Sequence, residues 1–358
     1  MIKYIVSFSI MIILVIIFLF SRLSDFELAG YGQLRTLSFT HHQDLLQGTL
    51  ILPPDKVYPP FVLLIHGDGP QDRWSDGGYI PLVNFLVSQG IAVFSWDKPG
   101  VGESTGNWLA QTMSDRAREA VLALQKLREQ PELKESRGGY LGFSQAGWVV
   151  PQASQLTTTD FIVLIGPAIN WRNQGIYYTE QRLKAEGRSM SALLDAKKHE
   201  AAVFDRQFTE EAANRPCNTP CTRQDFERRN SRADATKEIS GIDTPVFILM
   251  GKDDRNVDPD ETVAVWRKAL PVVQRVVSGS CRGQLTGFYA ANGLIINLPL
   301  SGLCGNRDCF CCPGNTPIRP GHLILSHHGS LSSNVGTELP SYYLPKAKQG
   351  VTKKPPVS

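Results

Sequence analysis

The sequence predicts an α/β protein built on a mostly parallel sheet, and two observations support this fold class. Short, continuous apolar runs of the length of buried strands alternate along the chain with segments of helical spacing. The chain has 358 residues, of which 42% are hydrophobic and 20% charged, so it can bury a large core. Its 37 basic and 34 acidic residues nearly balance, so no nucleic-acid partner is expected.

The expected elements follow in chain order. Residues 34–41 and 46–52 alternate or run apolar and predict a hairpin. The buried strands expected after it are 61–65, 91–96, 139–143, 161–165, 246–250 and 272–277. Helices are expected at 80–88, 113–129 and 260–269, and from Ala146 onward. Strands that alternate with helices in this way pair in parallel through crossover connections.

A long insert precedes the penultimate core strand. Residues 170–240 are charged, show helical spacing and contain no strand-like run. A structureless loop of this length is not expected inside a compact domain. We interpret the insert as a helical cap over the carboxyl edge of the sheet, where ligands bind in open α/β folds. An inert, solvated insertion is the alternative.

The N-terminus carries an apolar run, Tyr4–Phe20, interrupted only by Ser7 and Ser9. The run is long for the apolar part of a signal peptide and short for a spanning helix. No small-residue cleavage site follows, so residues 1–24 are interpreted as a signal anchor rather than a cleaved signal peptide. A buried core helix is disfavoured because the run has no polar face. Lys3 precedes the run and acidic residues follow it, which favours a membrane-anchored protein with its body exported to the periplasmic or extracellular face.

The composition changes at the end of the expected core, 30–278. Residues 280–358 hold 7 basic and only 2 acidic residues, and five of the seven cysteines. Residues 279–358 are therefore interpreted as an atypical, Cys-containing C-terminal segment for which an ordered fold is not predicted.

The cysteines give no metal motif. The spacing of Cys304, Cys309, Cys311 and Cys312 is not that of a zinc site, and no metal or cofactor is expected. Upstream, Cys217 and Cys221 lie four residues apart. They can close a small disulfide loop in an oxidising compartment or remain free thiols in a reducing one.

The segment Gly142-Phe143-Ser144-Gln145-Ala146-Gly147 follows a predicted strand and opens a predicted helix. A tight strand-to-helix turn lifts the serine side chain above the sheet. It also leaves main-chain N–H groups of the helix N-terminus nearby, where they can stabilise an oxyanion. An ordinary helix-capping serine is the alternative.

Four motifs in this order resemble those of the α/β-hydrolase superfamily, and more narrowly the bacterial serine esterases and acyl hydrolases whose elbow reads Gly-x-Ser-Gln-x-Gly-Trp. Residues 66–73 are similar to the family's oxyanion loop, and residues 96–104 are similar to its Asp-x-x-Gly-x-Gly-x-Ser turn. Residues 142–148 are similar to the nucleophile elbow, and residues 251–257 are similar to the Gly-x-x-Asp-x-x-Val acid loop. The resemblance runs from Leu34 to Val277 and stops near residue 278. Ala146 departs from the family's glycine but is small enough to keep the turn.

The resemblance implies roles for individual residues. Ser144 matches the nucleophile, and the main-chain N–H groups of Asp68 and Gln145 match the oxyanion-hole donors. Asp254 matches the acid that orients the histidine, in preference to Asp253. Capping of the helix that follows is the alternative role for this pair of aspartates.

The resemblance places the histidine of the triad after the last core strand, where the sequence offers His322, His327 and His328. Gly321-His322-Leu323-Ile324 fits a histidine loop followed by a helix, so His322 is the candidate base if residues 280–320 are an insertion. Alternatively, the family's C-terminus has been replaced and the triad is incomplete, which the change in composition supports. His66 is expected to be structural.

Taken together, these motifs predict a serine hydrolase that cleaves a small ester or acyl substrate through an acyl-enzyme, without a cofactor. The alternative is a catalytically impaired or non-catalytic α/β-hydrolase-like protein that has lost the triad histidine. A peptidase, a thioesterase and a lactonase are further alternatives within the first hypothesis. A haloalkane dehalogenase does not fit, because it needs a carboxylate at position 144.

Overall fold

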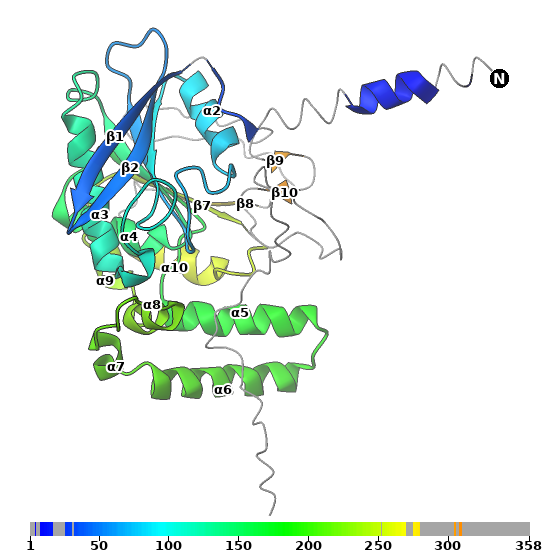
Figure 1. The fold of residues 1–358 in the computed structure, drawn as a ribbon. Coiled ribbons are helices and arrows are strands. Elements are labelled where there is room, and N and C mark those ends of the chain that lie inside the picture. Colours follow the sequence, from blue (N-terminus) through cyan, green and yellow to red (C-terminus); the bar gives the residue numbers. More distant parts are fainter. Residues whose placement is uncertain are drawn as a thin grey trace, which may run out of the picture.

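The computed structural model describes residues 4, 8–16, 26–30, 32–251, 253–269, 275–279, 304–305 and 308–309, the last three ranges by their backbone alone. The strands of the main sheet are β1 (Gln33–His41), β2 (Asp44–Leu52), β3 (Phe61–Ile65), β4 (Ala92–Trp96), β5 (Gly138–Phe143), β6 (Phe161–Ile165), β7 (Val246–Gly251) and β8 (Arg275–Gly279). Within this part of the chain they form one eight-stranded sheet in the order β1-β2-β4-β3-β5-β6-β7-β8 (Figure 1). The pairs β1–β2 and β2–β4 are antiparallel and the others are parallel, so the predicted fold class is confirmed.

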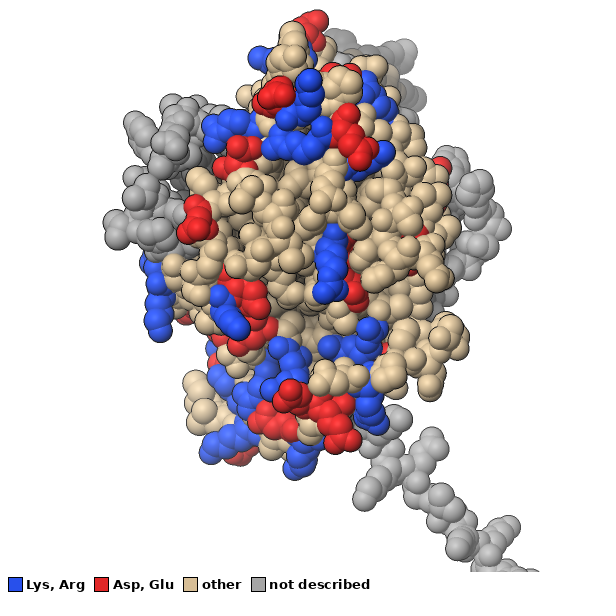
Figure 2. All heavy atoms as spheres, turned by 90° about the vertical axis from the view of Figure 1, so that its left-hand side faces the viewer, with Lys and Arg blue, Asp and Glu red and all other residues tan. Residues whose placement is uncertain are grey.

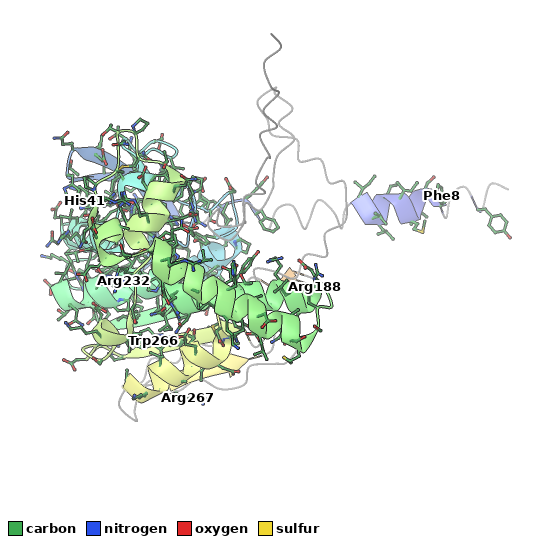
Figure 3. The ribbon with its side chains drawn as sticks, turned by 90° about the horizontal axis from the view of Figure 1, so that it is seen from below. Phe8, His41, Arg188, Arg232, Trp266 and Arg267 are labelled. Carbon is green, nitrogen blue, oxygen red and sulfur yellow. A yellow bond between two sulfur atoms is a disulfide. The ribbon has the colours of Figure 1, made fainter. Side chains whose placement is uncertain are left out.

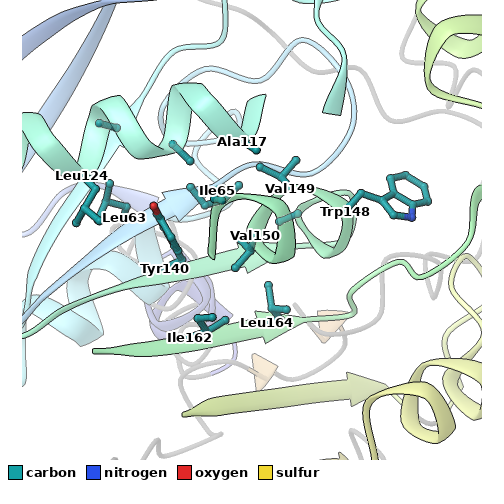
Figure 4. Packing of buried hydrophobic residues seen from close by; sticks show 14 of the residues in the cluster. Leu63, Ile65, Ala117, Leu124, Tyr140, Trp148, Val149, Val150, Ile162 and Leu164 are labelled. Carbon is teal, nitrogen blue, oxygen red and sulfur yellow. The ribbon is translucent and has the colours of Figure 1, made fainter. Parts of the chain in front are cut away.

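Helices cover both faces of the sheet. The core helices are α2 (Ile80–Ser88), α3 (Met113–Arg128), α4 (Ala146–Leu156) and α10 (Pro259–Ala269), with a short 3₁₀ turn, η2 (Trp108–Ala110), before α3. Successive side chains of a strand point to opposite faces. In β3, Leu63 and Ile65 accordingly pack with α3 and α4 (Figure 4), whereas Val62 and Leu64 pack with α2. The unbroken apolar runs of the central strands follow from this burial on both faces.

Five helices lie between β6 and β7. They are α5 (Trp171–Ala185), α6 (Met190–Gln207), α7 (Glu210–Asn214), α8 (Arg223–Asn230) and α9 (Thr236–Ile239). Helices α5 and α6 lie side by side, away from the sheet (Figure 1). Acidic and basic side chains intermingle over the lower end of the molecule, where these helices lie (Figure 2). A disulfide joins Cys217 to Cys221 in the loop before α8.

The two ends of the chain are described only in part. Residues 8–16, on which Figure 3 labels Phe8, are helical, and their side chains are exposed. Among the described residues, no helix combines the length and the apolar character that a membrane span requires. Near the other end, β9 (Cys304–Gly305) and β10 (Asp308–Cys309) pair antiparallel. The last strand of the main sheet is β8, at 275–279, which overlaps the predicted 272–277; residues 272–274 lie outside the described residues.

Strand register positions the loops that carry the sequence motifs. The β3–β5 pairing sets Ile65 opposite Gly142, so the chain after β3 runs beside the chain after β5. On the other side of β5, Phe143 pairs with Ile165 at the end of β6. In parallel strands all these ends lie at the same carboxyl edge, which is where open α/β sheets bind ligands.

Candidate active site

Ser144 lies on a sharp turn between β5 and α4. Its φ is +48°, a left-handed conformation that is costly for a residue with a side chain. Main-chain hydrogen bonds hold the turn: the N–H of Ser144 donates to Ile165 O at 3.0 Å, and Ser144 O accepts from the N–H groups of Gly147 at 2.9 Å and Ala168 at 3.0 Å. The serine is therefore held outside both the strand and the helix.

Small residues allow this turn to close. A Cβ at Gly142 would lie 2.6 Å from the Cβ of Ala146. A Cβ at Gly147 would overlap the main-chain nitrogen and oxygen of Ala168, in the segment that follows β6. Gly147 is thus required by the close approach of two backbone segments, and Gly142 by the tight packing of the turn against Ala146.

Two main-chain N–H groups lie beside the turn and donate no hydrogen bond within the described part of the chain. They belong to Asp68, in the loop after β3, and to Gln145, directly before α4. The two loops touch, because an added Cβ at Gly67 would lie 3.6 Å from the Cβ of Ser144. The side chains also meet, since Gln145 Nε2 donates to Asp68 Oδ1 at 3.0 Å. Two free donors on adjoining loops are what an oxyanion hole needs.

Asp254 lies on the loop after β7 and is only 3% exposed, whereas its neighbour Asp253 is exposed. Its Oδ1 accepts the main-chain N–H groups of Asn256 at 2.8 Å and Val257 at 3.0 Å. Its Oδ2 lies 3.5 Å from the position of a Cβ at Gly166 and accepts no hydrogen bond from the described residues. One carboxylate oxygen is thus held, and the other is left to accept an imidazole N–H.

Burial raises the pKa of Asp254 to about 6, although the two main-chain hydrogen bonds oppose the shift. The group is therefore ionised only above about pH 6. It lies near Ser144 through β6, because Gly166, which faces the carboxylate, directly follows Ile165, the acceptor of the Ser144 N–H.

His66 lies behind the site and is 1% exposed. Its Nε2 lies 2.6 Å from Trp96 O, and because a carbonyl only accepts, this nitrogen carries the proton. The ring stacks on Tyr79 with 5.6 Å between centroids. Burial lowers the pKa of His66 to about 3, so the ring is neutral at physiological pH and too weak a base to activate Ser144.

None of the four histidines in the described ranges makes a hydrogen bond or an ion pair with Ser144 or Asp254. They are His41, His42, His66 and His199. The sequence candidates His322, His327 and His328 lie outside the described residues. In the described ranges, no group of three or more His, Cys, Asp and Glu residues is arranged to hold a metal ion.

Four residues that contact the loops of the candidate site were not assigned a role from the sequence. Lys98 and Arg116 are buried and donate to the carbonyls of the loop after β3. Arg223 of α8 forms a two-pronged salt bridge with Asp68 at 2.7 and 3.1 Å, and Tyr177 of α5 donates to the main-chain carbonyl of Asp254. The inserted helices thus contact both loops of the site through Tyr177 and Arg223. In the sequence, both residues occupy positions typical of an exposed helix surface.

Comparison with known proteins relates this arrangement to known folds. The model of a family described as serine aminopeptidase, S33, matches residues 60–277, which is more than half of the chain. No curated protein sequence matches the chain.

Three solved structures are similar. The esterase Pf2001 of Pyrococcus furiosus is 18% identical, over 69% of this chain and 81% of that one, with a TM-score of 0.48. Est1E from Butyrivibrio proteoclasticus, with ferulic acid bound, is 15% identical over 68% and 89% of the chains, with a TM-score of 0.48. The α/β hydrolase GrgF from Penicillium sp. sh18 is 16% identical over 71% and 92%, with a TM-score of 0.50. At this identity the last shows a shared fold and nothing finer.

Proposed function

Because the chain belongs to the serine aminopeptidase, S33, family of α/β-hydrolases, we propose that it is a serine hydrolase that cleaves a small ester or acyl substrate at Ser144. The observation that carries the proposal is the position of Ser144 on a left-handed turn beside two free N–H groups. The elbow Gly-Phe-Ser-Gln-Ala-Gly-Trp, which resembles that of serine esterases, favours an ester over a peptide bond.

The proposed reaction has two halves. Ser144 Oγ attacks the substrate carbonyl carbon while a histidine takes the hydroxyl proton, and the carbonyl oxygen becomes an oxyanion that the N–H groups of Asp68 and Gln145 stabilise. The histidine returns the proton to the departing alcohol, which leaves an acyl-enzyme. Water, activated by the same base, then releases the acid. Asp254, ionised above about pH 6, orients the imidazole and stabilises its charged form.

His322 is proposed as the base, on its glycine-flanked position after the last core strand. The competing proposal is a non-catalytic protein with a replaced C-terminus. It is favoured by the change in composition after residue 279 and by the histidines of the described ranges, none of which contacts Ser144.

A fluorophosphonate probe tests the proposed function. The full-length wild type should form a covalent adduct that mass spectrometry locates on Ser144, and Ser144→Ala should form none. Ser154→Ala is the matched control, because this serine lies on α4 and its hydroxyl bonds Val150 O at 2.8 Å. A folded wild-type protein that forms no adduct at Ser144 would exclude a serine hydrolase and leave the non-catalytic protein.

We also propose that Tyr4–Phe20 anchors the protein in a membrane, with the body exported. The support is the apolar character of the run, interrupted only by Ser7 and Ser9, and the single lysine before it. The full-length protein should remain in the membrane fraction after carbonate extraction, and a chain that starts at Phe26 should not. Recovery of the full-length protein in the carbonate-soluble fraction would contradict this.

A further inference from the structure

Two buried cationic side chains lie behind the loop that follows β3. Lys98 Nζ donates to Gly67 O at 2.6 Å and to Gly69 O at 2.8 Å. Arg116 Nη2 donates to His66 O at 2.7 Å. Lys98 and Arg116 are 1% and 5% exposed, so water hardly reaches either group. Three carbonyls of one short loop are thereby turned toward the interior.

The direction of these carbonyls fixes the direction of the N–H groups. In a planar trans peptide, the carbonyl of one residue and the N–H of the next point in opposite directions. With Gly67 O directed at Lys98, the N–H of Asp68 points away from Lys98. Since Asp68 N–H donates to no group in the described ranges, it is held as a free donor.

The second donor is tied to the same group of side chains. Arg116 Nη1 hydrogen-bonds Gln145 Oε1, and the other end of that amide, Nε2, donates to Asp68 Oδ1 at 3.0 Å. Gln145 is 2% exposed, so its side chain is fixed between Arg116 and Asp68. A continuous chain of hydrogen bonds therefore connects the residues whose main-chain N–H groups flank Ser144.

The burial of Lys98 and Arg116 lowers the stability of the folded protein. Burial lowers the pKa of Lys98 well below its usual value, and the nearby charge of Arg116 lowers it further. Burial also lowers the pKa of Arg116. Removing charges from water costs several kcal/mol even when they are paired. An apolar side chain at either position would avoid this cost but would leave the loop carbonyls without donors.

We infer that Lys98 and Arg116 are positioning residues that hold the N–H groups of Asp68 and Gln145 in place for the oxyanion. The inference rests on the proposed function, in which these groups stabilise the tetrahedral intermediate. Preorganised donors stabilise the developing charge only if they do not have to move during the reaction. Neither Lys98 nor Arg116 contacts the substrate in this role.

The experiment uses the full-length chain with Lys98→Met, Arg116→Met and the matched control Arg128→Met. Arg128 lies on the same helix as Arg116 and also donates to main-chain carbonyls, those of Leu133 and Ser136, at the opposite end of the sheet. Hydrogen–deuterium exchange of the peptide covering residues 66–71 reports on the loop. The rate of Ser144 phosphonylation and the kcat and KM for p-nitrophenyl acetate report on the site.

In Lys98→Met and Arg116→Met, exchange in residues 66–71 should accelerate, and phosphonylation and kcat should fall about 10- to 100-fold with KM unchanged. This is less than the loss of about 10²- to 10³-fold from deleting an oxyanion donor outright. Arg128→Met should lower the Tm without either effect. A conservative Arg116→Lys variant, which keeps the charge but donates from a single nitrogen, should recover part of the rate.

Unchanged exchange in both variants would overturn the inference whether or not Ser144 reacts. Faster exchange with an unchanged phosphonylation rate would also overturn it, because the loop would then be held for reasons unrelated to the oxyanion. A wild-type protein that forms no Ser144 adduct would overturn the proposed function and, with it, the catalytic purpose of the contact.

Discussion

The hydroxyl of Tyr177 on α5 donates a hydrogen bond to the main-chain carbonyl of Asp254 at 2.6 Å. The inserted helices thus reach the loop of the candidate acid, just as Arg223 reaches the candidate oxyanion loop through Asp68. Both contacts cross from the insert to the core at the carboxyl edge of the sheet. The inserted helices therefore contact both loops of the candidate site.

Tyr177→Phe should consequently affect both stability and catalysis. Loss of one hydrogen bond should lower the free energy of unfolding by about 1 kcal/mol. The acid loop would lose one restraint, so kcat should fall about 3- to 10-fold. Urea unfolding and ester hydrolysis measure the two effects.

Tyr178→Phe is the control, because the hydroxyl of this adjacent tyrosine makes no hydrogen bond to the described residues. It should match the wild type in both measurements. Lower stability with wild-type kcat in Tyr177→Phe would show that the contact with the acid loop is structural only.

Asp254→Asn should stabilise the protein at alkaline pH while abolishing hydrolysis. Burial raises the pKa of Asp254 from 3.8 to about 6, so the folded state is destabilised by ionisation. This cost is absent below the ordinary pKa, grows as the pH rises and is complete above about pH 6, where it amounts to about 3 kcal/mol at most. The neutral asparagine avoids it, and the free energy of unfolding should rise by about 1–3 kcal/mol at pH 8 but hardly at pH 4.

Unfolding in urea at the two pH values checks this prediction, and Asp253→Asn, at the exposed neighbour, should change nothing. A variant less stable than the wild type at pH 8 would contradict it. That result would mean that the carboxylate has a cationic partner outside the described residues, as a triad histidine would provide.

Gly147→Ala should be destabilising, by up to about 2 kcal/mol, although alanine is the better helix former. The added Cβ would overlap the main chain at Ala168 and lie 2.9 Å from the carbonyl carbon of Pro167, and backbone atoms cannot move aside as a flexible side chain can. The overlap should cost about 1–3 kcal/mol, more than the gain of about 1 kcal/mol in helix propensity.

Thermal unfolding measures this effect. Gly241→Ala serves as the control, because a Cβ there meets only the end of the Gln155 side chain, at 3.0 Å. Equal Tm values for the two variants would show that the turn at Ser144 does not depend on the close approach at Gly147.

The central strands could be predicted from the sequence because each is buried on both faces. Every position in a run such as Phe61–Ile65 is apolar, so the strand can be recognised without knowing which strands lie beside it. The turn at Ser144 was also predictable, since its motif of small residues is contiguous in the sequence, from Gly142 to Gly147, and stands between a predicted strand and a predicted helix. Lys98 was not, because charged residues are expected at the surface and its carbonyl partners lie about 30 residues away.

Arg116 was hidden for a different reason. It lies on α3 among the apolar positions that predict the helix, such as Ala117 and Ala120, and its acceptors come from two other loops. Contacts between distant segments leave no periodic pattern. The same limit applies to the base, because chain order alone favours three histidines equally.

The three C-terminal histidines can be separated by single substitutions to alanine. If His322 is the base, His322→Ala should lower kcat/KM by at least about 10³-fold, because Ser144 would then keep its proton. His327→Ala and His328→Ala should stay within about twofold of the wild type, and each serves as a control for the other. Hydrolysis of p-nitrophenyl acetate gives the rates, and added imidazole should restore part of the activity of His322→Ala only.

If His327→Ala or His328→Ala instead loses activity, the base is that residue. The wild type and all three variants could instead hydrolyse the ester as slowly as Ser144→Ala. That result would mean that the C-terminus supplies no base. The composition of residues 280–358 would then be explained by replacement of the family's C-terminus and not by an insertion at 280–320.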